Sequence, residues 1–227
     1  MCGRFTLVTD PEKLMSRFQL QEILFDLKPR YNIAPGQPIP AILADGGRQR
    51  LGQLRWGLVP SWAQDDRNSY KMINARAETL TERPAFRKLF VRKRCLIPAD
   101  GFYEWRQTQK GKQSMRIMMK NEEPFAFAGL FDTWTNADGV KLHTCAIITT
   151  SANEVVAGIH DRMPVILKGP EEEAIWLDRD TCDSELLRSL LTPYDAAQMR
   201  AYPVSHIVGS PKNDVAECIQ EIAEPAW

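Results

Sequence analysis

Residues 101–149 read GFYEWRQTQKGKQSMRIMMKNEEPFAFAGLFDTWTNADGVKLHTCAIIT, and this stretch decides the fold class. Aromatic and β-branched residues recur there in short runs, which is typical of strands. Turn-forming residues separate the runs at Lys110-Gly111, at 121–124 and at 136–139. We therefore expect four strands connected as an antiparallel meander, at 101–107, 114–119, 125–134 and 140–149.

The rest of the chain adds strands and short helices around this region. Asp10-Pro11 is a helix start, with an N-cap followed by proline at the first helical position. Ser151 and Glu154 have the spacing of a capping box, and Asp45-Gly46-Gly47 is a turn signal. Further strands are predicted at 39–44, 50–59 and 164–168, and helices at 11–18, 83–91, 152–158, 170–177 and 183–191. The pattern predicts a single α+β domain over 1–227, with many antiparallel strands, peripheral helices and a sheet that can curl into a barrel.

The composition is that of a globular protein without a membrane span. The chain has 227 residues, of which 44% are hydrophobic and 26% are charged, and these values lie near the globular average. No apolar run approaches the roughly 20 residues that cross a bilayer, and the N-terminus lacks the apolar core of a signal peptide. We therefore expect a cytoplasmic protein with no membrane partner.

The five cysteines are too scattered for a disulfide framework or a zinc site. The sequence also lacks a Walker loop and the GxGxxG, HExxH and GxSxG motifs, so neither a metal nor a cofactor is expected. Four cysteines have apolar neighbours and are predicted to be reduced residues in or near the core: Cys95, Cys145, Cys182 and Cys218.

The net charge of zero conceals two oppositely charged segments. Residues 48–94 carry twelve basic and four acidic side chains, whereas residues 171–227 carry four basic and twelve acidic ones. A basic face can attract polyanions although the total is neutral, but the two segments could instead lie side by side and cancel. Residues 83–94 alone hold six basic residues and no acidic one, on a predicted helix that is either merely solvated or an electrostatic footprint for nucleic acid.

Cys2 follows the initiator methionine directly, so removal of Met1 would leave an α-amine beside a thiol. An α-amine titrates near 7.7–8.0, and a useful neutral fraction therefore exists at pH 7. The neutral amine can form a Schiff base with an aldehyde, which the thiol can close into a thiazolidine ring. The same pair could act instead as an N-terminal nucleophile in amide hydrolysis. A cysteine at a frayed terminus would have neither role, but an apolar segment follows Phe5 and predicts a terminus that is held down.

Two further side chains are candidates for proton transfer. His160 lies in a polar loop, flanked by Asp161 and Arg162, where it is either an acid/base group or a structural partner of Asp161. Glu104 lies on an aromatic strand, and alternation places it on the same face as Phe102. Burial there would raise the pKa of Glu104 towards the range that is useful for proton transfer, whereas an ion pair with an arginine is the structural alternative.

Two polar features are typical of contacts to a nucleic acid. If Asn74-Ala75-Arg76 is extended, an amide and a phosphate-matching guanidinium share one face. Trp62 precedes the polar residues 64–69, so it is a candidate stacking platform for an unpaired base, although core packing explains most tryptophans.

Eight blocks of the sequence carry a further signal when they are taken in order. They are MCGRF (1–5), YNIAPG (31–36), WGLVPSW (56–62), NARAET (74–79), ADGFYEW (99–105), AGLF (128–131), ITT (148–150) and IHDRMP (159–164). Each block alone is modest, but the ordered set from residue 1 to about residue 210 is highly specific. The chain resembles the SOS-response-associated peptidase (SRAP) family.

The resemblance implies a single compact domain with a mixed, mostly antiparallel, barrel-like sheet and with DNA in a basic cleft. It implies a protein that senses abasic sites in single-stranded DNA, with Cys2 as the nucleophile of a covalent thiazolidine crosslink that shields the lesion. The remaining catalytic positions that it implies are Asn74, Glu104 and His160, and the DNA-binding positions are Arg4, Trp62, Arg76, Trp105 and Arg162. It also implies a possible self-processing peptidase and abasic-site lyase activity, in a monomer that associates with the nucleoid if bacterial.

Two rival functions stay open on the sequence alone. An N-terminal-nucleophile cysteine peptidase or amidohydrolase would turn over amide substrates without DNA. A non-enzymatic single-strand-binding module would bind DNA equally well without Cys2 and would show no preference for abasic sites.

Overall fold

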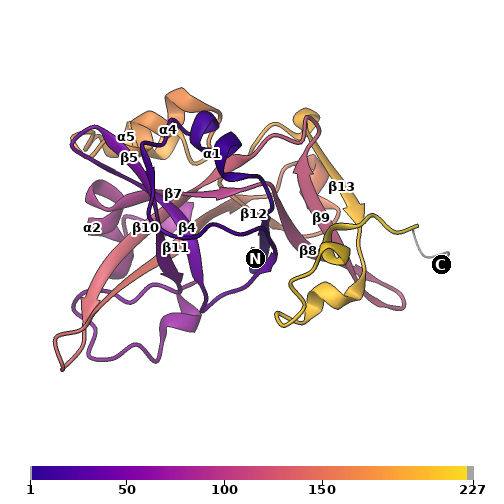
Figure 1. Ribbon diagram of the computed structural model, residues 1–227, viewed down its shortest axis with the longest axis horizontal. Helices are drawn as coiled ribbons and strands as arrows, with labels where there is room; N and C mark the ends of the chain where they lie inside the picture. Colours follow the sequence, from indigo (N-terminus) through magenta and orange to yellow (C-terminus); the bar gives the residue numbers. More distant parts are fainter. Residues whose placement is uncertain (1, 224–227) are drawn as a thin grey trace.

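Residues 2–223 are described in the computed structural model, where they form two β-sheets flanked by α-helices (Figure 1). The α+β class expected from the sequence is therefore confirmed. The α-helices are α1 (Pro11–Arg17), α2 (Pro84–Arg92), α3 (Glu154–Ala157), α4 (Pro170–Leu177) and α5 (Ser184–Ser189). Short 3-10 turns are η1 (Ser69–Lys71), η2 (Ala77–Thr79), η3 (Ala196–Gln198), η4 (His206–Gly209) and η5 (Ala216–Ile219).

A closed barrel forms the centre of the larger sheet. Its strands are β4 (Pro38–Asp45), β5 (Arg48–Trp56), β7 (Arg94–Ala99), β10 (Phe125–Thr135) and β11 (Lys141–Ser151). Neighbours pair antiparallel in the order β5-β4-β7-β10-β11. The ring closes because β11 also pairs parallel with β5, at Thr144 opposite Arg55 and Cys145 opposite Trp56. The predicted barrel-like, mostly antiparallel sheet is therefore confirmed.

Two three-residue strands continue the pairing of β11 beyond the barrel. β6 (Asn74–Arg76) runs parallel to β11, on the edge that β5 occupies earlier along the strand. β12 (Arg162–Pro164) pairs antiparallel with β11 on the other edge. Thr149 of β11 lies opposite both Arg76 and Pro164, so two of the eight sequence blocks, 74–79 and 159–164, are held on either side of one strand. A short strand, β2 (Glu22–Ile23), adds to β5.

The four strands predicted as one meander are shared between the larger sheet and a smaller, second sheet. Its strands, in the order β13-β9-β8-β1-β3, are β1 (Phe5–Leu7), β3 (Arg30–Ile33), β8 (Gly101–Thr108), β9 (Gly111–Met119) and β13 (Met199–Pro203). β8 and β9 form a hairpin here, whereas β10 and β11 form a hairpin in the barrel. The expectation of one continuous meander was wrong because the link from 120 to 124 leaves the ladder. Glu122 has a φ of 60°, and Pro124 has no N–H to donate.

The predicted helices all form, with differences at their ends. Asp10 caps α1 as expected and accepts from the backbone nitrogen of Lys13. The N-cap of α3 is Asn153, which accepts from Val156 N, and not Ser151, because Ser151 still pairs with Arg162 in the ladder between β11 and β12. The strand predicted at 164–168 is instead β12, which ends at Pro164.

The N-terminal strand is packed into the barrel by aromatic contacts. The ring of Phe5 lies 5.4 Å from that of Trp56 and 5.8 Å from that of Phe127, both in edge-to-face arrangements. Such pairs contribute about 0.5–1.5 kcal/mol beyond their buried area. The prediction that the terminus is held down is therefore confirmed from Cys2 onward. The other cysteines are free: Cys95, Cys145 and Cys218 are buried and Cys182 is half-buried, as predicted.

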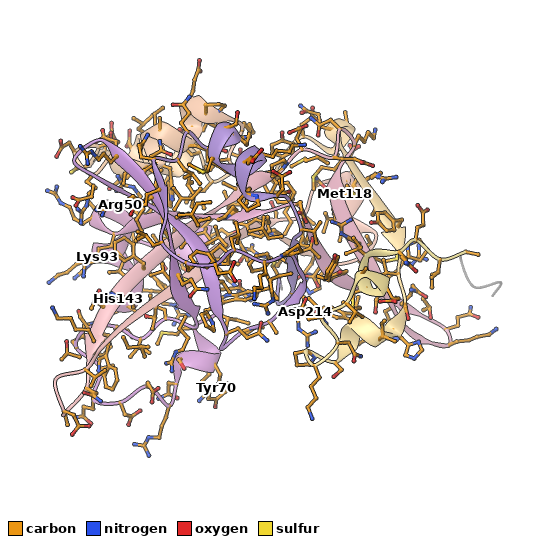
Figure 2. The ribbon with its side chains drawn as sticks, viewed as in Figure 1. Arg50, Tyr70, Lys93, Met118, His143 and Asp214 are labelled. Carbon is orange, nitrogen blue, oxygen red and sulfur yellow. The ribbon has the colours of Figure 1, made fainter. Side chains whose placement is uncertain are left out.

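The segment after β13 is tied to β3. Asp214 accepts hydrogen bonds from the backbone nitrogens of Tyr31 and Asn32 at 2.6 and 2.9 Å and pairs with Arg30 (Figure 2). The hydroxyl of Tyr103 lies 3.2 Å from the carbonyl oxygen of Cys218. These contacts hold the C-terminal segment against the small sheet.

Candidate active site

The N-terminal segment places Cys2 in the core beside β6. Cys2 is fully buried, and its backbone carbonyl accepts a hydrogen bond from Nδ2 of Asn74 at 2.9 Å. Ala75 is buried, while Asn74 and Arg76 are half-buried and exposed on the opposite face of the strand, as the alternation predicted. The sequence-based expectation about Met1 falls outside the described residues.

The oxygen of the Asn74 side-chain amide has no hydrogen-bond donor among the described residues. Oδ1 of Asn74 is buried and accepts no hydrogen bond from any residue between 2 and 223. A buried carbonyl oxygen without a donor costs about 1–3 kcal/mol. An N–H group of a bound molecule would relieve this cost, so the amide can both hold the Cys2 backbone and orient a nitrogen placed next to it.

Glu104 lies on the inward face of β8. The side chain is 2% exposed and shares its face with the fully buried Phe102, whereas Tyr103 and Trp105 pack into a separate cluster on the other face. Burial raises the pKa of the Glu104 carboxyl, and the nearby positive charge of His160 offsets the rise in part. A carboxyl whose pKa is raised in this way keeps its proton to a higher pH than an exposed carboxyl and can serve as a proton donor.

The Cys2 thiol is also kept in its neutral form. Burial raises the pKa of the thiol, and the negative charge of Glu104 raises it further. The two groups therefore lie close enough to influence each other's ionisation, and a thiolate is disfavoured at neutral pH.

His160 follows α3 and has two polar contacts through the same nitrogen. The backbone nitrogen of Arg162 lies 3.0 Å from Nδ1 of His160, and Oδ1 of Asp161 lies 2.8 Å from it. These contacts suit different protonation states, because Nδ1 accepts from the Arg162 N–H only when it carries no proton. We assign the first contact to the neutral ring and the second to the imidazolium.

The four predicted catalytic residues therefore converge from four separate parts of the chain. Cys2 precedes β1, Asn74 begins β6, Glu104 lies in β8 and His160 precedes β12. Asn74 contacts Cys2 directly, Glu104 shifts the pKa of the Cys2 thiol, and His160 shifts the pKa of Glu104. An amide, a neutral thiol, a protonatable carboxyl and an imidazole at one point can carry out Schiff-base chemistry with proton transfer.

Asn74 also lines a basic groove. It has a volume of about 450 Å³, and Trp62 and Asn74 line it together with three cationic side chains, Lys71, Arg76 and Arg83. No acidic residue of the described chain belongs to its lining. Arg76 is exposed there, which places an available guanidinium beside the amide of Asn74.

Two of the arginines predicted to bind DNA already have protein partners. Arg162 forms a bidentate pair with Glu78, at 2.5 and 2.9 Å, and donates to the carbonyl of Thr149 at 2.7 Å. This pair lowers the pKa of Glu78. Arg4 donates to Asn32 Oδ1 at 3.1 Å and to the carbonyls of Val208 and Gly209 at 2.6 and 3.1 Å. Arg4 thereby joins the N-terminus to the C-terminal segment.

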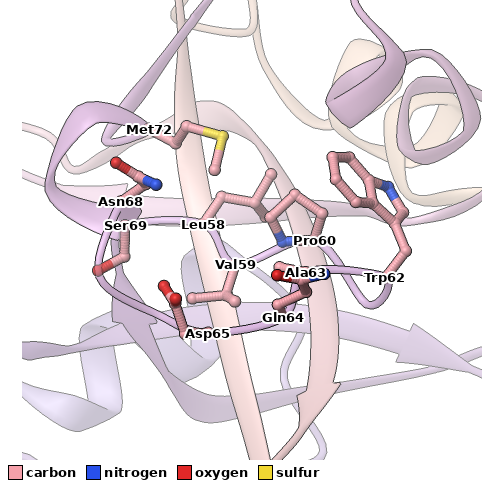
Figure 3. Close-up of a pocket in the computed structure, with 10 residues that line it drawn as sticks. All are labelled: Leu58, Val59, Pro60, Trp62, Ala63, Gln64, Asp65, Asn68, Ser69 and Met72. Carbon is pink, nitrogen blue, oxygen red and sulfur yellow. The ribbon is translucent and has the colours of Figure 1, made fainter.

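The two predicted aromatic contacts lie in different surroundings. Trp62 is 68% exposed and borders both the basic groove and a second pocket, of about 410 Å³, behind it (Figure 3). Trp105 is half-buried and packs against the small cluster that contains Tyr103. Trp62 is therefore the freer of the two rings.

The basic stretch from 83 to 94 has both structural and exposed members. Arg94 is buried and donates to main-chain oxygens, among them that of Trp176 at 2.6 Å. Lys93 forms an ion pair with Asp132 at 2.7 Å (Figure 2). The exposed members are Arg83, Arg87, Lys88 and Arg92. Contact of these four side chains with nucleic acid stays a prediction.

Some residues of the site were not foreseen as functional. Lys71 and Arg83 add positive charge to the groove. Glu78 forms an ion pair with Arg162. Glu78 lies in the NARAET block, two residues after Arg76, but no local pattern indicates a partner that lies 84 positions along the chain.

Most of the chain matches a known protein family. The family model described as "SOS response associated peptidase (SRAP)" matches residues 1–211. The chain belongs to the SRAP family. The resemblance drawn from the eight sequence blocks is therefore confirmed.

SRAP relatives of this chain carry names that refer to DNA lesions. It is 52% identical over 223 residues to "Abasic site processing protein YoqW" of Bacillus subtilis, covering 97% of this chain and 99% of the relative. It is 35% identical to "Abasic site processing protein HMCES" of Gallus gallus, covering 86% of this chain and 67% of that protein. A crystal structure of a Bacteroides thetaiotaomicron protein is 28% identical, with a TM-score of 0.88, covering 98% of this chain and 100% of that one.

Residues 2–223 contain neither a candidate membrane-spanning helix nor a candidate metal site. None of the described helices is long and apolar enough to cross a membrane. Within residues 2–223, no group of three or more His, Cys, Asp and Glu side chains could hold a metal ion.

Proposed function

We propose that this SRAP protein senses abasic sites in single-stranded DNA and forms a thiazolidine crosslink to them through Cys2, after loss of Met1, so that the lesion is shielded. The observation that carries the proposal is the convergence of Cys2, Glu104 and His160 with Asn74, which also lines a basic groove. The names of the relatives, abasic site processing proteins, support the choice of substrate.

The proposed reaction has three steps, which balance with the loss of one water. His160 assists opening of the abasic sugar, which exposes an aldehyde at C1. The neutral α-amine of Cys2 adds to C1, and Glu104 supplies the proton with which the hydroxyl leaves as water. The Cys2 sulfur then adds to the same carbon of the resulting iminium, the thiol proton returns to the Glu104 carboxylate, and a thiazolidine ring closes.

The surroundings of each group suit its proposed role. Glu104 can donate a proton because burial raises its pKa, and general acids of this kind contribute 10²–10⁴-fold. The unused Oδ1 of Asn74 can accept the N–H of the intermediate. A Cys2 thiol that keeps its proton leaves the amine as the first nucleophile.

The same thiol weakens the rival interpretation as a peptidase. Cysteine peptidases attack with a thiolate, whose formation needs a lowered thiol pKa. The pKa of Cys2 is raised by burial and by Glu104, so hydrolysis of other amide substrates is not favoured here. Self-removal of Met1 and strand cleavage from the Schiff base remain secondary parts of the proposal.

The DNA strand is proposed to lie in the basic groove. Arg76 and Arg162 would contact phosphates, while Trp62 and Trp105 would stack on bases next to the lesion. Arg4, whose guanidinium already contacts three protein oxygens, would act by holding the N-terminal segment in place. Contacts of this kind predict binding that weakens steeply with salt.

The test mixes purified protein, with a free Cys2 terminus confirmed by mass, with matched oligonucleotides that contain or lack one abasic site. We expect a heat-stable band on a denaturing gel that requires the abasic site, at the summed mass less one water. Absence of any adduct from protein with a free Cys2 terminus would refute the proposal.

Replacement of Glu78 by Gln is expected to strengthen binding to undamaged single-stranded DNA. The carboxylate occupies both terminal nitrogens of Arg162, so a phosphate must displace it. Since Glu78 is half exposed, the expected gain in affinity at low salt is about twofold to fivefold. Glu82→Gln is the matched control, because Glu82 is an exposed carboxylate in the same segment. Equal affinities of the two variants, measured by fluorescence anisotropy, would show that Glu78 does not compete with phosphate.

A further inference from the structure

A second pocket adjoins the basic groove behind Trp62. Its volume is about 410 Å³, and it is lined by residues of the segment 58–72 (Figure 3). Leu58 and Val59 are buried and, with Pro60 and Met72, give it an apolar floor. Trp62 and Met72 also line the basic groove, so the two hollows share a wall and a strand in one can place a group in the other.

The rim of this pocket is fixed to the barrel. Nε1 of Trp134 donates to the carbonyl of Ala63 at 2.7 Å, and the backbone nitrogen of Ser61 donates to Asp132 at 2.7 Å. Asp66 pairs with Arg55 at 3.0 Å. A rim that is held at three points keeps its shape without a ligand, as binding pockets usually do.

Two amide side chains on the rim have unused hydrogen-bonding capacity. The side chains of Gln64 and Asn68 line the pocket, and neither forms a hydrogen bond with another residue in the described range 2–223. Asp65, by contrast, is engaged by Arg67 at 2.5 Å. The free groups are therefore neutral donors and acceptors above an apolar floor.

This combination fits one class of ligand. An apolar floor, neutral amides and an exposed indole at the entrance suit a flat, uncharged molecule with polar edges, which describes a nucleobase. The three cations of the adjoining groove, Lys71, Arg76 and Arg83, suit the phosphates that such a base would bring with it.

We propose that the pocket formed by residues 58–72 receives an unpaired base of the bound strand, close in sequence to the abasic nucleotide, and that Gln64 and Asn68 contact its polar edge. The inference rests on the proposed function, because it assumes that single-stranded DNA lies in the groove. Amide side chains pair best with adenine, through its N6 and N7 atoms, so adenine is the expected preference. The pocket would make capture of an abasic site depend on the neighbouring sequence.

The test measures crosslinking rates at subsaturating DNA for oligonucleotides that differ at one position. Each carries one reactive abasic site in a thymine background, with adenine, cytosine or an unreactive base-free spacer at each of the three positions on either side. We expect adenine at one of these positions to raise the rate about fivefold or more over the spacer, which is the lower end of the discrimination by one bidentate pair.

A double variant, Gln64→Ala with Asn68→Ala, is expected to lose this preference and to crosslink the spacer oligonucleotide at the wild-type rate. Gln109→Ala is the matched control, since Gln109 is an exposed amide in the turn between β8 and β9. Rates that are the same for every neighbour, or a preference that survives in the double variant, would overturn the pocket proposal alone. Failure of all abasic oligonucleotides to crosslink would instead refute the proposed function.

Discussion

A Cys2→Ala variant with a free N-terminus is expected to form no heat-stable adduct with abasic single-stranded DNA. Alanine keeps the α-amine, so the Schiff base can still form, but no sulfur is present to close the ring. An unreduced Schiff base hydrolyses on denaturation. We therefore expect complete loss of the stable band, together with an adduct that reappears when borohydride is added during the reaction. Intact mass and denaturing gels measure both outcomes.

Cys182→Ala is the control for this experiment. Cys182 is a free, half-buried thiol remote in sequence from the proposed centre, and its removal is expected to leave the crosslink at the wild-type level. A stable band from Cys2→Ala without reductant would assign the linkage to another residue. No trapped adduct with reductant would remove the α-amine from the mechanism.

Replacement of Glu104 by Gln is expected to slow crosslinking by about 10²–10⁴-fold, the usual contribution of a general acid or base. Gln has nearly the same shape but cannot give up a proton. DNA affinity is expected to change little, because Glu104 is buried away from the lining of the basic groove. Single-turnover kinetics at saturating DNA separate the two effects, and a rate within threefold of wild type would exclude Glu104 from proton transfer.

The same variant should be more stable than the wild type at high pH. Burial raises the pKa of Glu104 in the folded state, so the folded protein holds this proton more tightly than the unfolded chain. Stability from this group is then present at acid pH and is lost as the pH rises through the raised pKa. Glu104→Gln removes that loss, so its melting temperature should exceed the wild type at pH 8 and match it near pH 4. A lower melting temperature for the variant at pH 8 would contradict the direction of the shift.

The alternation of β8 was predictable from the sequence, and with it the burial of Glu104 beside Phe102. The candidate site was predictable from the eight blocks, because Cys2, Asn74, Glu104 and His160 each belong to one of them. The structure adds the direct contact of Asn74 with Cys2.

Features that depend on distant pairing were not predictable in the same way. Closure of the barrel requires Thr144 to meet Arg55, and neither residue carries a local sign of the other. Arg94 belongs to a basic run, yet its guanidinium donates to main-chain oxygens at the end of α4. The basic residues around Arg94 look the same in the sequence whether its side chain is buried or exposed. The sequence does not show which main-chain carbonyls lack a donor and will accept from it.

The segment between β5 and β6 has both of its ends fixed on one strand. Trp56 at its start lies opposite Cys145, and Asn74 at its end lies opposite Ile147. The two attachment points are set by pairing with β11 and not by the residues between them. The intervening segment can therefore change while both of its ends keep their positions. Changes in the length or sequence of this segment are expected to alter the proposed DNA groove, while Asn74 stays in register with β11 and keeps its contact with Cys2.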